Sequence, residues 1–164
     1  MNTSTASGYY LFGIYYKSSN DTAYRWAVNV NGTSFALHFG TTTNTSVSGF
    51  SRDVWHTIQA DYRGLKVDLN NWVYSSAAPF TTENIDVSIA LFGRHDVTYD
   101  GVTDDFVVMR DCFYQYFKIF DNGTLVRDFI PVRVGQTGYM YDKISRTLFG
   151  NVGTGDFILG PDKN

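Results

Sequence analysis

The last third of the chain constrains the fold most strongly, because short aromatic runs alternate there with residues that favour turns. Residues 113–120 are rich in aromatic and β-branched side chains and too few for a typical helix, so they predict a strand. Asp121-Asn122-Gly123 tolerates positive φ and predicts a tight hairpin turn. The partner strand is predicted at 125–134, where Pro131 should occupy an edge, a bulge or the strand's end because it has no N–H to donate.

A second and tighter strand pair is predicted further along. Residues 139–141 and 147–149 should pair across 142–146, and the Asp142 side chain should accept a hydrogen bond from the backbone two residues on and so begin the turn. Gly153 and Gly155 then precede a last predicted strand at 156–159.

This segment also resembles a known family. The run IFDNGTLVRDFIPVR, followed by YMYDKISRTLFGNVGTGDFILGP, is similar to the C-terminal half of laminin-G-like domains in the concanavalin A-like lectin/glucanase superfamily. The variant that it resembles occurs in phage structural proteins and gut-bacterial surface proteins. The resemblance continues more weakly through 54–58 and 89–93, and it implies a jelly-roll β-sandwich. Arg146 departs from the family pattern, which often has Gly in this turn.

The N-terminal half predicts further strands. Residues 9–16 form one, with Gly13 at a bulge or a close approach. The clearest hairpin is 24–30 with 33–39, joined by Asn31-Gly32, which would pair Val28 with Phe35 and Trp26 with Leu37. Trp26, Val28, Phe35 and Leu37 would then share one buried face. The polar residues 40–49 are expected to be a loop.

The middle of the chain continues the pattern. Residues 55–62 and 65–69 should pair around Arg63-Gly64, with Ile58 opposite Leu69, and 72–74 should return after Asn70-Asn71. Residues 85–92 alternate like a half-buried strand, whereas 93–105 are polar and predict a loop. With no convincing amphipathic helix, the fold class is all-β, an antiparallel two-sheet β-sandwich.

The whole chain, 1–164, is predicted to be a single laminin-G-like domain. It begins close to what resembles the family's third strand, so the N-terminal strands are divergent, missing or supplied by another chain. An edge at Phe157-Ile158-Leu159 would then be unpaired, which predicts a strand or subunit contact there.

Composition excludes several partners. The formal net charge is -3 and basic residues are scattered singly, which argues against binding to nucleic acid or to an anionic membrane. No stretch approaches the about 20 apolar residues that a membrane helix needs, and residues 1–8 do not resemble a signal peptide. Cys112 is the single cysteine, so no disulfide forms within the chain.

Glycoside hydrolysis is the activity that the superfamily name suggests, and it needs a pair of carboxylates flanking the scissile bond. The glucanases of the superfamily use two Glu on one strand. This chain has one Glu, Glu83, in a Thr-rich stretch, and no predicted strand carries alternating acids. The protein is therefore predicted not to be an enzyme.

Calcium is the one cofactor that the sequence suggests. Asp96, Asp100, Asp104 and Asp105 lie close together in the predicted loop 93–105, and calcium prefers several oxygen ligands. Their spacing matches no EF-hand, so a solvated acidic loop and a calcium site both stay open.

Sugar binding would use exposed aromatic rings beside polar side chains. The candidates are Trp72 and Tyr74 near the Asn70-Asn71 turn, and Tyr99 beside Arg94 and His95. Each aromatic also has a purely structural reading.

The resemblance and these residues together predict a non-catalytic carbohydrate-binding or adhesion domain of a phage virion or a bacterial surface or secreted protein. Its partner would be a glycan or a cell-surface polysaccharide. The alternative is a structural decoration or assembly domain of a capsid, tail or fibre, bound to other virion proteins. A homo-oligomer is expected in either case.

Overall fold

The computed structural model describes residues 9–17, 23–40, 43–51, 54–61, 64–68, 70–74, 88–98, 104–108, 113–152 and 155–160. These residues form fourteen strands and no helix, so the predicted all-β class is confirmed. No part of these ranges supplies a helix that could cross a membrane. The chain divides into two compact units, Met1–Cys112 and Phe113–Asn164, and each is described separately.

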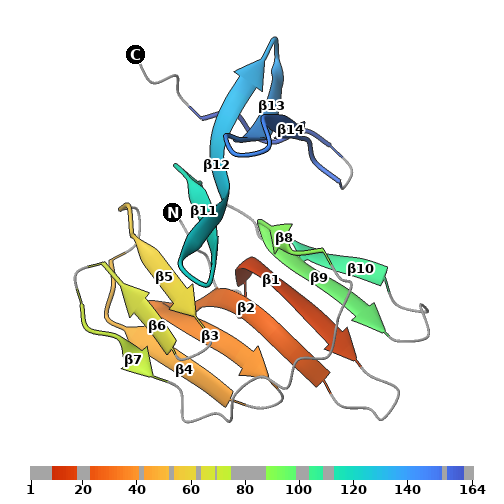
Figure 1. Cartoon of the computed structure of the whole chain (residues 1–164). Coiled ribbons are helices and arrows are strands. Elements are labelled where there is room, and N and C mark those ends of the chain that lie inside the picture. The colour runs from red at the N-terminus through yellow and green to blue at the C-terminus, as the bar shows by residue number, and fades with distance from the viewer. Residues whose placement is uncertain are drawn as a thin grey trace. The chain divides into compact units, whose positions relative to one another are not determined.

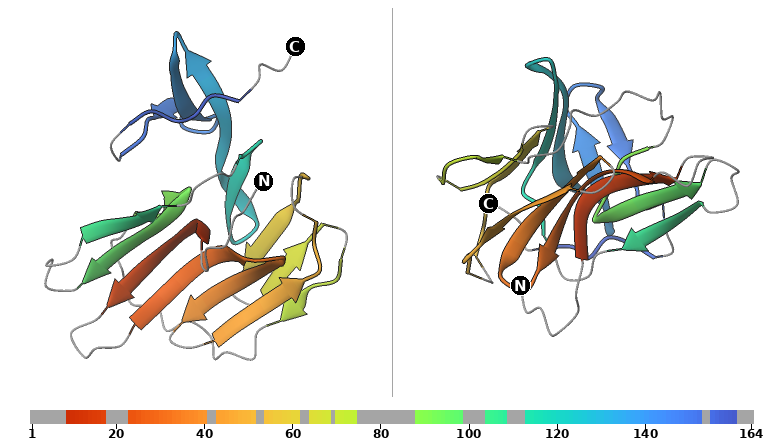
Figure 2. Two further views of the ribbon diagram at one scale, coloured as in Figure 1. Left: turned by 180° about the vertical axis from the view of Figure 1, so that it is seen from behind. Right: turned by 90° about the horizontal axis from the view of Figure 1, so that it is seen from below.

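The larger sheet of the first unit has seven strands in the order β10-β9-β1-β2-β3-β4, and β8 also pairs with β1 (Figures 1 and 2). Its neighbours are antiparallel, except that β1 and β9 run parallel. The strands are β1 (Tyr9–Lys17), β2 (Ala23–Asn31), β3 (Ser34–Gly40), β4 (Thr43–Ser48), β8 (Ala90–Leu91), β9 (Gly93–Thr98) and β10 (Asp104–Val108).

A second sheet completes the first unit. It contains β5 (Ile58–Asp61), β6 (Gly64–Val67) and β7 (Val73–Tyr74), and β6 lies against β3 and β4 (Figure 1). Leu65 and Val67 of β6 are fully buried, as are Leu37 of β3 and Val28 of β2. Each such side chain contributes about 1.5–3 kcal/mol by leaving water. The first unit is therefore a β-sandwich with its core between the two sheets.

The second unit is a four-stranded antiparallel sheet of β11 (Phe117–Asp121), β12 (Thr124–Val134), β13 (Thr137–Asp142) and β14 (Thr147–Phe149), in that order. Asn122 and Gly123, with φ of 47° and 81°, join β11 to β12, which confirms the tight turn predicted at Asp121-Asn122-Gly123. The pairing of β11 with β12 ends at Phe129, so Pro131 lies beyond it, at a locally open edge of β12.

The turn between β13 and β14 is built on Asp142, as predicted. Ile144 N donates to Asp142 Oδ1 (3.1 Å), and both Ser145 N (3.2 Å) and Ser145 Oγ (2.7 Å) donate to Oδ2. Asp128 N on β12 donates to Oδ1 (2.9 Å). Arg146, where the resembled family often has Gly, has φ of 59° and so occupies the left-handed region.

Gly13 is a close approach, as predicted. A Cβ there would lie 2.3 Å from the Ala27 Cβ on β2, closer than two carbon atoms can approach. A register shift between Tyr10 and Phe12 places a bulge next to it in β1.

The predicted register of the hairpin of β2 and β3 is wrong by two residues. Val28 pairs with Leu37, and the turn is Gly32-Thr33 rather than Asn31-Gly32. Gly32, with φ of 61°, occupies the first central position, where Gly favours a type II′ turn. Because the shift is even, it moves residues along the same face, and Phe35 and Leu37 are buried as expected.

Four other predicted elements are also corrected. Residues 40–49 are not a loop, because Thr43–Ser48 form β4 at the edge of the sheet. Residues 93–105 are not one loop either, since they contain β9 and the start of β10. Of the predicted strand 85–92, residues 85–87 lie outside the described residues, and within 88–92 the strand is limited to Ala90–Leu91. Residues 156–159 form no strand, and Phe157 and Leu159 instead lie over Gly138 of β13.

Candidate functional site

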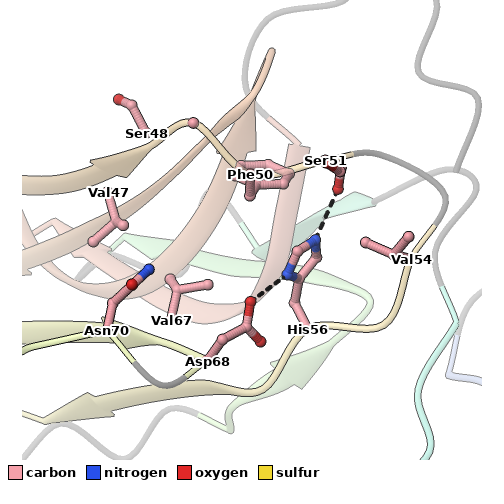
Figure 3. A pocket seen from close by; sticks show the side chains of 10 residues that line it. Val47, Ser48, Phe50, Ser51, Val54, His56, Val67, Asp68 and Asn70 are labelled. Atoms are coloured by element: carbon pink, nitrogen blue, oxygen red, sulfur yellow. Dashed lines mark hydrogen bonds and ion pairs between the residues drawn. The ribbon is translucent and has the colours of Figure 1, made fainter.

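A hollow of about 280 Å³ opens in the first unit, next to the ends of β4 and β6 (Figure 3). Part of its lining is apolar and part carries polar groups. The lining residues are Val47, Ser48, Gly49, Phe50, Ser51, Val54, His56, Val67, Asp68 and Asn70. A concave surface of this mixed character is the usual setting of a ligand site.

His56 joins two sides of this pocket. Its Nδ1 lies 2.7 Å from Asp68 Oδ2, and its Nε2 lies 2.8 Å from the Ser51 carbonyl oxygen (Figure 3). Both partners can accept and neither can donate, so both ring nitrogens satisfy them only when both carry a proton. The geometry therefore favours the imidazolium form.

The local electrostatics agree with this geometry. Burial lowers the pKa of His56, but the hydrogen bonds to Asp68 and Ser51 and the charge of Asp68 outweigh it, so the pKa is raised above 6.5. Burial raises the pKa of Asp68, but hydrogen bonds from His56 and from the Thr57 backbone outweigh it and lower that pKa below 3.8. The pair is thus an ion pair near pH 6.

The backbone fixes Asp68 where β6 ends. Its φ of 54° is in the left-handed region, which Asp tolerates better than most residues. Asp68 N donates to Thr57 O (2.7 Å), and Thr57 N donates back to Asp68 Oδ1 (2.8 Å). These bonds extend the pairing of β5 with β6 by one residue pair, Thr57 with Asp68, and so place His56 next to the Asp68 carboxylate.

Aromatic packing sets the other wall. The Phe50 ring is stacked on Phe35, with centroids 3.9 Å apart, and both meet the His56 ring edge-on, at 5.2 and 5.6 Å. Gly49 N donates to Thr33 O (3.0 Å), which ties the start of this wall to the turn between β2 and β3. The segment 49–51 is therefore held at both ends.

Trp55 is next in sequence to the pocket residues and is exposed to solvent. It is 59% exposed and lies between two lining residues, Val54 and His56. A large exposed aromatic next to a polar hollow provides a flat apolar surface with hydrogen-bonding groups beside it.

The arrangement suits binding better than acid–base catalysis. A general base needs a ring nitrogen aimed at the substrate proton, whereas both nitrogens of His56 bind protein acceptors. The Ser34 hydroxyl donates to the Ser48 hydroxyl (2.8 Å).

The residues predicted from sequence as the ligand site are not gathered at this pocket. Trp72, which is half-buried, precedes β7 of the smaller sheet, whereas Arg94 and His95 lie on β9, four strands from β4. At about 4.8 Å per strand, β9 and β4 are about 19 Å apart. The side chain of Tyr74 and the whole of Tyr99 lie outside what the structure describes.

Arg94 instead takes part in a compact cluster on the larger sheet. Its guanidinium group donates to both carboxylate oxygens of Asp96, each at 2.5 Å, and to the Tyr10 hydroxyl (2.6 Å). It also lies over the rings of Tyr10 and Tyr15, at 4.3 and 4.8 Å. His95 Nδ1 lies 3.0 Å from the Ser88 carbonyl oxygen. The cluster binds β9 to β1.

The predicted calcium ligands are described only in part. Both oxygens of Asp96 accept hydrogen bonds from Arg94, and Asp105 pairs with Asp96 across β10 and β9. Asp100 and the side chains of Asp104 and Asp105 fall outside the described parts of the chain. Within those parts, no group of three or more potential metal ligands occurs. The calcium site stays a prediction.

Sequence reasoning missed the exposure of Trp55 and the position of His56 in the pocket lining. Trp55 was assigned to a strand that in fact begins at Ile58, so its exposure could not be read from alternation. The position of Asp68 opposite Thr57 depends on the register of β5 and β6.

Comparison of the chain with protein-family models, with curated proteins and with solved structures finds no match.

Proposed function

We propose that the protein is a non-catalytic carbohydrate-binding domain that holds a glycan at the pocket of Phe50, Trp55, His56 and Asp68. The observation that carries this proposal is the partly polar hollow of about 280 Å³, with the exposed side chain of Trp55 next in sequence to two of its lining residues. Sugar rings present one apolar face and a rim of hydroxyl groups. An aromatic ring covers such a face, and carboxylate, amide and hydroxyl groups bind the rim.

The scaffold supports this role physically. The site lies on loops that leave the edge strand β4 and the buried strand β6, and binding residues commonly lie on loops held by a rigid scaffold. The described lining contains no Lys or Arg, and the charge of His56 is balanced by Asp68. A neutral sugar fits this balance better than an anionic one. The resemblance to laminin-G-like domains supports a location in a phage virion or at a bacterial surface.

The second candidate function is assembly with other virion proteins. This role is favoured by the second unit, because many of its large hydrophobic side chains are exposed to solvent. Those at least 44% exposed are Phe113, Tyr116, Phe120, Val134, Ile144, Leu148, Phe149, Val152 and Ile158. A stable assembly would bury more than about 1,000 Å² in total.

A glycan array with the full chain tests the first proposal. Trp55→Ala should weaken binding to any positive glycan roughly tenfold or more, because truncating a central aromatic contact typically costs over about 1 kcal/mol. Phe120→Ala is the matched control, since Phe120 is also 59% exposed but belongs to the second unit. Equal losses in both variants, or no binding by the wild type, would refute the site.

Light scattering separates the two functions. A trimer or larger assembly together with an empty array would support the assembly role. Phe120→Ala should then reduce the mass of the assembly measured by light scattering, whereas Trp55→Ala should leave it unchanged.

A further inference from the structure

Two hydrogen bonds tie the pocket wall to the rest of the first unit. The segment 49–51 is tied to the sandwich by Gly49 N to Thr33 O at one end and by the Ser51 carbonyl to His56 Nε2 at the other. Phe50, between these two bonds, lines the pocket. The second bond requires a proton on Nε2.

Loss of that proton affects the two partners of His56 differently. Neutral histidine keeps one N–H, and the carboxylate of Asp68 is a stronger acceptor than the Ser51 carbonyl. The remaining proton therefore stays on Nδ1, which is 2.7 Å from Asp68 Oδ2. The lone pair of Nε2 would then face the Ser51 oxygen at 2.8 Å, where two acceptors repel.

We propose that His56 is a pH-sensitive latch: its imidazolium form ties Ser51 to Asp68 and closes the wall of the pocket, and deprotonation releases the segment 49–51. The link to ligand binding rests on the proposed function, whereas the latch itself is a property of the protein without ligand. Glycan affinity would be high at mildly acidic pH and would fall at alkaline pH.

Few of the described groups can influence the protonation equilibrium of His56. Among the described residues with recorded contacts to its ring, Asp68 is the charged one, and the others are the Ser51 carbonyl, Phe35 and Phe50. The raised pKa of His56 has the sign that the latch needs, because protonation stabilises the closed form.

Nuclear magnetic resonance of the ligand-free full chain tests the latch. The imidazole nitrogens of His56 are titrated from pH 5 to pH 9, and amide protection of 49–51 is followed over the same range after correction for intrinsic exchange. We expect a midpoint above 6.5 and a loss of protection at Phe50 and Ser51 of roughly tenfold or more through that midpoint. Residues 143–146 of the second unit are the internal control and should not change.

Two variants sharpen the result. In Asp68→Asn the midpoint should fall, because the charge that favours the proton is removed. In His56→Gln the protection of 49–51 should no longer vary between pH 5 and pH 9. If either variant does not fold, the wild-type titration decides alone.

A wild-type His56 midpoint at or below 6.5, or constant protection of 49–51 through the titration, would overturn the latch. A working latch combined with an empty glycan array would refute the proposed function but not the latch.

Discussion

Replacing Asp142 by Asn should loosen the turn between β13 and β14 and remove its dependence on acid. The Asp142 side chain is fully buried and accepts hydrogen bonds from Asp128 N, Ile144 N, Ser145 N and the Ser145 hydroxyl. Arg127 Nε lies 3.7 Å from Oδ2. An Asn at this position turns an NH₂ group toward donors and leaves some of them without an acceptor.

The size of the effect follows from the proton equilibrium of Asp142. Burial raises its pKa, but the four hydrogen bonds outweigh it and lower the pKa from 3.8 to about 2. At about 1.36 kcal/mol per pH unit, the ionised carboxylate contributes about 2 kcal/mol to folding near neutral pH. Since the pKa is depressed in the folded state, this contribution is complete above 3.8 and is lost as the pH falls through about 2.

Amide hydrogen exchange is the suitable assay, because Trp26, Trp55 and Trp72 all belong to the first unit and do not report on this turn. At pH 7, Asp142→Asn should reduce the protection of Ile144 and Ser145 by a factor that corresponds to about 2 kcal/mol. The wild type should lose the same protection between pH 4 and pH 2, and the variant should not. If the variant kept wild-type protection at pH 7, the carboxylate would not be what holds the turn.

Two further substitutions test backbone geometry by thermal or urea unfolding. Gly13→Ala should destabilise the first unit by about 3 kcal/mol or prevent its folding, because the new Cβ would lie 2.3 Å from the Ala27 Cβ. Gly160→Ala is the control, because no atom lies within 4 Å of the position of its Cβ. Equal losses of stability in the two variants would refute the close approach at Gly13. Arg146→Gly should stabilise the second unit by up to about 1 kcal/mol, because Arg146 has φ of 59° and Gly removes that strain at some entropic cost in the unfolded chain. Arg133→Gly, inside β12, should instead destabilise it, and a loss in both variants would contradict the turn geometry.

The second unit could be predicted well from sequence because its turns are local. Asn122-Gly123 supplies two adjacent positive φ values, and Asp142 accepts from the backbone two residues ahead, so neither needs a distant partner to be specified. The strand predicted at 156–159 failed because nothing in its own sequence shows that it packs over Gly138 without pairing.

The first unit was harder because its strands are defined by their neighbours. The polar segment that became β4 reads as a loop by itself and is a strand because β3 offers it a backbone edge. Likewise, Gly32 suits either central position of a hairpin turn, so the dipeptide Asn31-Gly32 alone did not decide the register of β2 and β3.

The same kind of error hid the candidate site. The predicted register placed Ile58 opposite Leu69, whereas Ile58 pairs with Val67. The observed register continues to Thr57 and Asp68, whose mutual hydrogen bonds bring His56 to the carboxylate. The error of two residues in the predicted register of β5 and β6 therefore hid the pairing of His56 with Asp68. The exposure of Trp55, next to His56 in the sequence, became apparent only from the structure.

The two ionic centres, one in each unit, should limit stability at opposite ends of the pH scale. Asp142 contributes above 3.8 and loses its contribution in acid, whereas His56 contributes below 6.5 and loses its contribution as the pH rises through its raised folded value. Stability should therefore be greatest between about pH 4 and pH 6.5; the alkaline loss should begin in the first unit, whereas the acid loss involves Asp142 of the second unit and also Asp68 of the first, whose pKa is lowered below 3.8. Tryptophan fluorescence should report the alkaline loss, and amide exchange at 143–146 the acid loss. A single transition seen by both probes at both ends would show instead that the two units unfold together.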